Sequence, residues 1–240
     1  LLTLVGMEAP KSMDADDVKD EKVKVLKSIK KLSNIRKIAA IGQYKGYTKE
    51  PEVNKNSRTE TYAALKVEID SKILKGVPFY LRTGKKLKDK STEIVIVYRK
   101  APFRLFSKQS MEANMLIIRV QPYEGITLEF NAKVPGKKVI IDNVTMDFCH
   151  ECQFGPNSPE AYERLLYDVT IGDQTLFTRW DEVENAWKIA DTIKSTFKNA
   201  KPLIYEKGVW GPEEANKLIE KDGRKWIEPK KPAYAEQLEK

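Results

Sequence analysis

Strand-like runs follow one another through the middle of the chain, between residues 59 and 144. From Thr59 the side chains alternate in character, and further runs cover Phe79–Leu81, Ile94–Tyr98, Met115–Val120, Ile126–Phe130 and Val139–Val144. Most connections are too short for the helical crossover that joins parallel strands, so successive strands are expected to be antiparallel. The sequence therefore predicts an open antiparallel sheet.

Helical patterns flank these strands. The apolar start, Leu1–Val5, resembles the middle of a helix. Acidic residues from Asp14 to Asp17 favour a helix start, and one apolar face follows at Val18, Val25, Ile29 and Leu32. After the strands, Ser158-Pro159 forms an N-cap with proline in the first helical turn.

A second C-terminal helix is predicted from Asp181-Glu182-Val183-Glu184, a capping-box variant. Its buried stripe should be Val183, Ala186, Trp187, Ala190, Ile193 and Phe197. A last short helix should begin at Gly211-Pro212. The composition of residues 41–58 predicts a loop. The lysine-rich end from Lys221 is predicted to be a solvated tail. This order predicts an α+β fold, with a large, mostly antiparallel sheet and helices packed on one face.

The bulk composition fits a globular protein. At 240 residues, with 41% hydrophobic residues, the chain can bury a substantial core. Since no apolar run approaches the ~20 residues of a membrane span, we expect no membrane partner and a cytoplasmic location. The net charge of +8 favours anionic partners, but lysines far outnumber arginines and alternate with acids, so nucleic-acid binding is disfavoured.

Cys149 and Cys152 are the only cysteines, and His150 between them is the only histidine. Their spacing suggests a metal or redox site. A closed zinc site needs about four ligands, and a thioredoxin-type motif would open a helix in a βαβ unit rather than follow a strand. A structural role is therefore preferred. No serine lies in a nucleophile elbow that would support a Ser-His-Asp triad.

A strand that runs into lysines is the strongest candidate for chemistry. Gly76-Val77-Pro78-Phe79-Tyr80-Leu81-Arg82-Thr83 leads into Gly84-Lys85-Lys86-Leu87. A lysine on a rigid support neutralises one charge of a phosphate, and Lys90 follows a polar turn that could return it toward the same anion. From the residues alone, solvated surface lysines remain the alternative.

This segment resembles the glucose-6-phosphate dehydrogenases, which carry a very similar Val-Pro-Phe-Tyr-Leu-Arg-Thr-Gly-Lys run in their C-terminal half. Further similar segments occur in the same order, at residues 17–26, 59–66, 118–122 and 160–169. The resemblance implies that residues 1–240 form one C-terminal substrate-binding and dimerisation domain, without the N-terminal dinucleotide-binding domain. It also implies that Lys85 and Lys90 contact glucose 6-phosphate, and that Gln121 approaches the sugar phosphate.

The resemblance further implies NADP as cofactor and a homodimer formed through the sheet. The chain has no Gly-x-Gly-x-x-Gly cradle for a dinucleotide, and the family's catalytic histidine would fall just before Leu1. We therefore expect the 240-residue chain alone to be inactive. An accessory structural NADP site is not expected, because Ser91 and Val95 stand where basic residues would be, although Arg119 matches. The competing hypothesis is a non-catalytic module that dimerises or binds anions.

Overall fold

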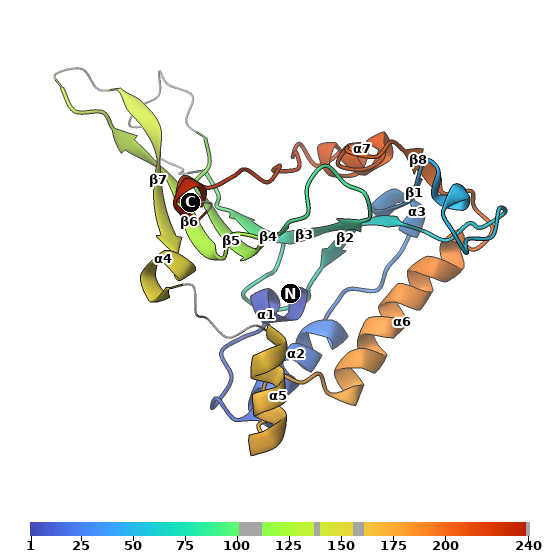
Figure 1. Cartoon of the computed structure of the whole chain (residues 1–240), viewed down its shortest axis with the longest axis horizontal. Coiled ribbons are helices and arrows are strands. Elements are labelled where there is room, and N and C mark those ends of the chain that lie inside the picture. Colours follow the sequence, from blue (N-terminus) through green and yellow to red (C-terminus); the bar gives the residue numbers. More distant parts are fainter. Residues whose placement is uncertain (101–111, 137–139, 156–160, 239–240) are drawn as a thin grey trace. The chain divides into compact units, whose positions relative to one another are not determined.

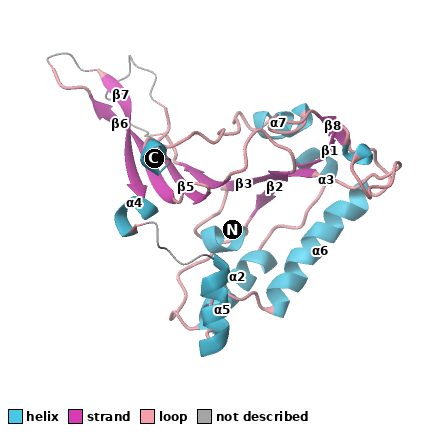
Figure 2. Ribbon diagram, viewed as in Figure 1, coloured by secondary structure: helices cyan, strands magenta, loops and turns pink. Residues whose placement is uncertain are grey.

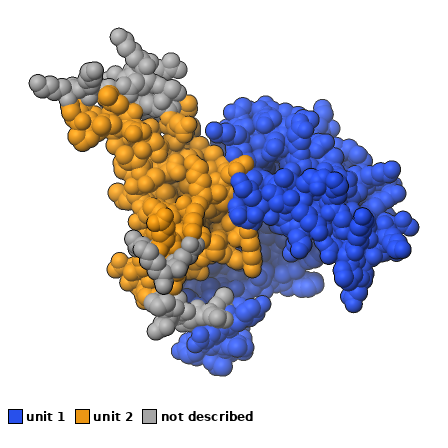
Figure 3. All heavy atoms as spheres, turned by 45° about the horizontal axis from the view of Figure 1, so that its top comes forward, with its two compact units in different colours: residues 1–89, 161–226 blue, residues 90–160, 227–240 orange. Residues whose placement is uncertain are grey.

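The chain is described by a computed structural model that covers residues 1–100, 112–136, 140–155 and 161–238 (Figure 1). Its contacts divide it into two compact units (Figure 3). Unit 1 comprises residues 1–89 and 161–226, and unit 2 comprises residues 90–160 and 227–240. Helices and mostly antiparallel strands occur together (Figure 2), so the predicted α+β class is confirmed.

Unit 1 is built on a four-stranded sheet of order β3-β2-β1-β8. Strand β1 (Ala39–Tyr44) pairs antiparallel with β2 (Tyr62–Glu68), and β2 pairs antiparallel with β3 (Pro78–Gly84). The short strand β8 (Leu203–Tyr205) pairs with β1 in parallel. A strand from near the end of the chain thus completes the edge of a sheet begun near its start.

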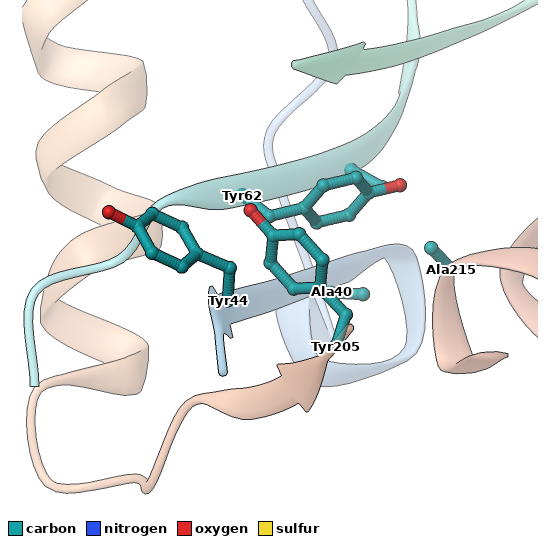
Figure 4. Packing of buried hydrophobic residues seen from close by; sticks show 6 residues of the cluster. Ala40, Tyr44, Tyr62, Tyr205 and Ala215 are labelled. Carbon is teal, nitrogen blue, oxygen red and sulfur yellow. The ribbon is translucent and has the colours of Figure 1, made fainter. Parts of the chain in front are cut away.

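The two faces of this sheet pack against different elements. Ala40, Tyr44, Tyr62 and Ala64 lie on one face, where they form a buried cluster with Tyr205 and with Ala215 of α7 (Glu213–Glu220) (Figure 4). On the other face, Ile69 follows β2 and lies beside Gly6 and near Val25. Those residues belong to α1 (Leu2–Gly6) and α2 (Ala15–Lys27), so helices cover both faces.

The remaining helices of unit 1 are α3 (Ile35–Ile38), α5 (Ala161–Ile171) and α6 (Trp180–Phe197), and a 3₁₀ turn covers Tyr47–Lys49. Helix α6 packs along α2, where Lys22 and Glu182 form an ion pair of 2.7 Å. Arg179 at the N-cap of α6 contacts Asp20 of α2 at 2.5 Å and Asp181 at 2.8 Å. These charged contacts fix the start of α6 against α2.

Unit 2 holds a second four-stranded sheet of order β4-β5-β6-β7. Its strands are β4 (Thr92–Val97), β5 (Met115–Gln121), β6 (Gly125–Lys133) and β7 (Ile141–Cys149), all joined antiparallel. One face bears polar residues, where Arg119 bonds Thr127 and Thr127 bonds Asp147. Helix α4 (His150–Phe154) follows β7 and contacts α8 (Ala235–Leu238) near the C-terminus.

The structure confirms the strand expectations for residues 62–68, 79–81, 94–97, 115–120 and 126–130. It differs from the expected single sheet, because the described strands form two sheets of four, and from the expected one-sided helix packing. The part of the predicted final strand at Val139 and the predicted cap at Ser158-Pro159 lie outside the described residues.

Several local expectations are wrong. Residues 41–44 belong to β1, not to a loop, because the apolar Ala39-Ala40-Ile41 run can pair with β2. Helix α2 ends at Lys27, since Ile29 instead forms a bridge with Ile69. The supposed solvated tail is partly buried, with Tyr234 only 6% exposed.

The α6 predictions also need correction. The helix starts at Trp180, and Asp181 bonds the Arg179 guanidinium rather than closing a capping box. None of its stripe residues is fully buried, and Trp187 is 55% exposed. The spacing of the apolar residues correctly predicted a helix. It did not predict how far the other described residues bury this apolar stripe.

Candidate functional site

The lysine turn, defined here as Lys85-Lys86-Leu87, leaves the end of β3 with its backbone held at three points. The N–H of Lys85 donates to the Thr61 carbonyl at 2.8 Å, which continues the β2–β3 ladder by one residue. The Lys85 carbonyl accepts from the Tyr205 hydroxyl at 2.7 Å. The Lys86 carbonyl accepts from the N–H of Gly208 at 3.0 Å. The turn is therefore held by three hydrogen bonds from two segments, one at Thr61 and one at residues 205–208.

Gly84 permits the close approach of this turn to the buried cluster. A Cβ at position 84 would lie 2.7 Å from the Tyr62 ring and 3.1 Å from the Leu87 side chain. Lys86 adopts a positive φ of 54°, an uncommon conformation for a residue with a side chain. Leu87 packs against the cluster that contains Tyr62 and Tyr205. The turn thus carries local backbone strain that its packing compensates.

The two lysines of the turn differ in their electrostatic surroundings. Glu50 has a pKa below its usual value, chiefly because it accepts a hydrogen bond from Lys207, with a smaller contribution from the charge of Lys86. Lys85 is exposed, and within the described residues its ammonium group makes no ion pair or hydrogen bond. Lys85 therefore keeps its positive charge and its three donors available for an external anion.

Arg82 anchors the strand that leads to the turn. Its guanidinium lies 4.9 Å from the Trp210 ring centre and 4.8 Å from that of Trp226. Tyr80, two residues earlier and on the same face of β3, bonds Asp222, which also pairs with Lys66 at 2.7 Å. These contacts attach the C-terminal part of unit 1 to β3.

A pocket of about 460 Å³ opens on the opposite face of the same sheet. Ile41 and Phe197 supply apolar walls, and charged residues surround them, namely Arg58, Lys194, Lys198, Lys201, Glu60 and Asp191. Ile41 pairs with Ala63, and Ala63 pairs with Thr83. Because side chains alternate along a strand, Lys85 continues the Thr83 side, so it extends from the sheet face on which this pocket lies.

The other two predicted substrate residues belong to unit 2. Gln121 is the last residue of β5 and pairs with Thr92, the first residue of β4. Lys90 lies two residues before Thr92, so the structure brings Lys90 and Gln121 to the same end of the β4–β5 pair. Both are exposed, and Gln121 precedes a cis peptide bond to Pro122.

Arg119, the one residue that matches the family's accessory NADP site, is only 7% exposed. Its Nε lies 3.3 Å from a Glu93 carboxylate oxygen, and its guanidinium also bonds Thr127. Arg119 therefore takes part in an internal network of the unit 2 sheet.

The cysteine pair forms a Cys149–Cys152 disulfide at the junction of β7 and α4. The Cys149 sulfur also accepts the N–H of Cys152, which caps α4. His150 lies 3.9 Å from Glu124 and stacks near Phe154. In the described part of the chain, no cluster of three or more His, Cys, Asp or Glu side chains is placed to hold a metal.

Sequence reasoning missed the residues that hold the lysine turn. These residues are Thr61, Tyr205 and Gly208, and all three are distant from Lys85 in the sequence. No motif marks the segment that contains Tyr205 and Gly208. Only the parallel β1–β8 pairing brings Tyr205 beside the β2 end. The short apolar Leu203-Ile204-Tyr205 run indicates that the tyrosine side chain is buried, but it does not indicate which groups the tyrosine hydroxyl bonds.

A helix able to cross a bilayer, which must be both long and apolar, does not occur among the described residues.

Residues 1–227 match the family model described as glucose-6-phosphate dehydrogenase, C-terminal domain. The chain is 45% identical to glucose-6-phosphate 1-dehydrogenase of Chlamydia pneumoniae, over 94% of this chain and 48% of that protein. It is 38% identical to the enzyme of Bacillus subtilis strain 168, over 94% of this chain and 50% of that protein.

Solved structures agree with these relatives. A glucose-6-phosphate 1-dehydrogenase from Mycobacterium avium superposes with a TM-score of 0.81 at 37% identity, covering 96% of this chain and 48% of that one. A glucose-6-phosphate dehydrogenase in complex with its substrate glucose-6-phosphate gives a TM-score of 0.83 at 32% identity, covering 95% and 49%. The chain spans about half the length of the curated relatives it matches. By sequence and by fold, the chain belongs to the glucose-6-phosphate dehydrogenase family and matches its C-terminal domain.

Proposed function

We propose that this chain forms the C-terminal part of an NADP-dependent glucose-6-phosphate dehydrogenase. The complete enzyme oxidises glucose 6-phosphate to 6-phospho-glucono-1,5-lactone in the pentose phosphate pathway, in the cytoplasm. Family membership supports this activity, and one relative of known structure binds glucose-6-phosphate. The residues present here lack a Gly-x-Gly-x-x-Gly cradle, so they do not fit the dinucleotide, and we assign NADP binding to the rest of the polypeptide.

Within this chain, we assign the substrate phosphate to Lys85. The observation that carries the assignment is an exposed ammonium group, without an ion pair in the described part of the chain, on a backbone that three hydrogen bonds hold in place. A rigid support lowers the ordering cost of binding, and a charge-assisted contact to phosphate is strong. Lys90 and Gln121, at one end of the β4–β5 pair, stay predicted substrate contacts.

The partner that we propose is a second copy of the same chain, bound through the sheet of unit 2. We propose no nucleic-acid or membrane partner. One face of this sheet is apolar along all four strands, with Ile94, Ile118, Leu128 and Met146 among its members. Met146 is 62% exposed and Phe148 is 43% exposed. Contiguous exposed apolar surface of this kind marks an interaction site.

Lys85→Ala in the complete enzyme tests the assignment. Loss of a phosphate contact costs about 1.5 to 3 kcal/mol, so KM for glucose 6-phosphate should rise about 10- to 100-fold. KM for NADP should stay nearly unchanged, because Lys85 contacts only the sugar phosphate. Lys86→Ala is the matched control, since Lys86 is the neighbouring lysine of the same turn and its charge contributes to the lowered pKa of Glu50. An unchanged KM for glucose 6-phosphate in Lys85→Ala would reject the assignment of the substrate phosphate to Lys85.

A further inference from the structure

Tyr205 contacts the backbone of the lysine turn directly. Its side chain is 3% exposed, and its hydroxyl lies 2.7 Å from the Lys85 carbonyl, 3.1 Å from the Thr61 carbonyl and 3.1 Å from the Thr61 hydroxyl. Figure 4 shows this hydroxyl directed toward β2. One buried hydroxyl thus joins the residue before β2 to the residue after β3.

The phenol ring is itself held rigidly. It packs against the Tyr44 ring at 6.4 Å and the Tyr62 ring at 5.5 Å, in edge-on and tilted arrangements. Its backbone pairs with Tyr44 in the parallel β1–β8 ladder, and the N–H of Lys45 donates to the Tyr205 carbonyl at 2.8 Å. Burial raises the pKa of the Tyr205 hydroxyl, so it remains a protonated donor at neutral pH.

We propose that Tyr205 is a positioning residue for the substrate phosphate, acting through the Lys85 backbone. This inference rests on the proposed function of Lys85. The hydroxyl holds the Lys85 carbonyl, so the strained Lys85-Lys86 backbone keeps one conformation before substrate arrives. Without it, the turn samples more conformations, and binding must order them again. The side chain of Tyr205 touches no substrate in this scheme.

The test is the ratio of kcat/KM for glucose 6-phosphate to that for glucose, measured in the complete enzyme. Glucose lacks the phosphate, so a change confined to the phosphate contact alters this ratio, whereas a general loss of folded enzyme lowers both values equally. Tyr205→Phe keeps the ring and removes only the hydroxyl. We expect the ratio to fall three- to tenfold, through KM, with kcat for glucose 6-phosphate within twofold of the parent enzyme.

Tyr44→Phe is the matched control. Tyr44 belongs to the same buried cluster and is 6% exposed, but its hydroxyl bonds Glu50 at 3.2 Å rather than the lysine turn. We expect Tyr44→Phe to leave the ratio unchanged. An equal fall of the ratio in both variants would assign the effect to the cluster and overturn the specific role of Tyr205.

A double-mutant cycle with Lys85→Ala separates this inference from the proposed function. If Tyr205 acts through Lys85, then Tyr205→Phe should cause no further fall of the ratio once Lys85 is alanine. A full further fall in that background would overturn the inference, as would an unchanged ratio in Tyr205→Phe alone. If Lys85→Ala itself leaves the ratio unchanged, the substrate assignment of Lys85 fails instead, and the positioning role fails with it.

Discussion

Single residues around the β3 end divide into those that can meet a ligand and those that hold the protein together. Lys85 forms no ion pair within the described residues, whereas the charge of Lys86 acts on Glu50 and Arg82 lies near two indole rings. All three occur within five residues of one basic-rich run. Sequence alone cannot distinguish them, because the distinction comes from partners in distant segments.

Asp222 gives a residue-scale prediction about pH. Its pKa lies below the usual value, first because of its hydrogen bond with Lys66 and then because of that with Tyr80. A lowered pKa in the folded state stabilises the protein above the unfolded-state pKa of about 3.9 and loses that effect as pH falls through the folded-state value. Asp222→Asn should therefore cost about 1 to 2 kcal/mol at pH 7 and progressively less below about pH 4.

Urea unfolding of the parent chain and of Asp222→Asn at pH 7 and at pH 3 measures this difference. Glu213→Gln is a suitable control, because the Glu213 side chain is 76% exposed and pairs with Lys217 on the same helix. That variant should show no measurable pH-dependent loss. A stability difference for Asp222→Asn that is the same at both pH values would contradict the prediction.

At the scale of elements, the junction between β5 and β6 depends on Gly125. A Cβ there would collide with the backbone carbonyl of Phe148 and with the Tyr234 hydroxyl. Gly125 pairs with Cys149 in the β6–β7 ladder, so the carbonyl cannot move without opening the sheet. Gly125→Ala should destabilise unit 2 by about 3 kcal/mol.

Chemical denaturation followed by far-ultraviolet circular dichroism tests this value. Gly155→Ala is the control in the same unit, because a Cβ at position 155 meets no atom of the described residues within 4 Å, while its positive φ of 83° adds strain. That change should cost about 1 kcal/mol. Adding Tyr234→Phe to Gly125→Ala should not restore stability, since the carbonyl of Phe148 remains; full restoration would show that the hydroxyl alone caused the effect.

The sequence predicted elements better than it predicted their partners. Alternation identified β2, and short strand-like runs identified β3 and the strands of unit 2. It missed β1, whose residues are almost all buried and therefore do not alternate. It also missed β8, whose Leu203–Tyr205 run is too short to show a pattern. The candidate lysine was predictable from its local run, but the hydroxyl that holds it was not.

For the whole molecule, the open face of the unit 2 sheet predicts self-association. Ile126, Val144, Met146 and Phe148 lie on one face of β6 and β7 and are all substantially exposed. The opposite face carries the Arg119–Thr127–Asp147 network and receives Tyr234. The two faces are therefore chemically distinct, and the apolar face is the one on which we propose that a second copy binds.

If the proposed dimer forms through this face, Met146→Glu should convert it to a monomer, because the substitution places a charge on the apolar face. Sedimentation velocity measures the outcome directly. Met13→Glu is the matched control, since Met13 is 78% exposed and lies in a loop of unit 1. Retention of the dimer in Met146→Glu would place the interface on another surface.

The parallel pairing of β1 with β8 also sets an order of events during synthesis. Unit 1 takes three strands from residues 39–84 and its last strand from residues 203–205, and residues 90–160 of unit 2 are encoded between its two stretches. During translation, Lys85 is therefore synthesised well before Tyr205, whose hydroxyl bonds the Lys85 carbonyl. A nascent chain that ends before β8 has its lysine turn but not the hydroxyl that holds it, so the phosphate-binding geometry proposed here matures only when the last part of unit 1 emerges.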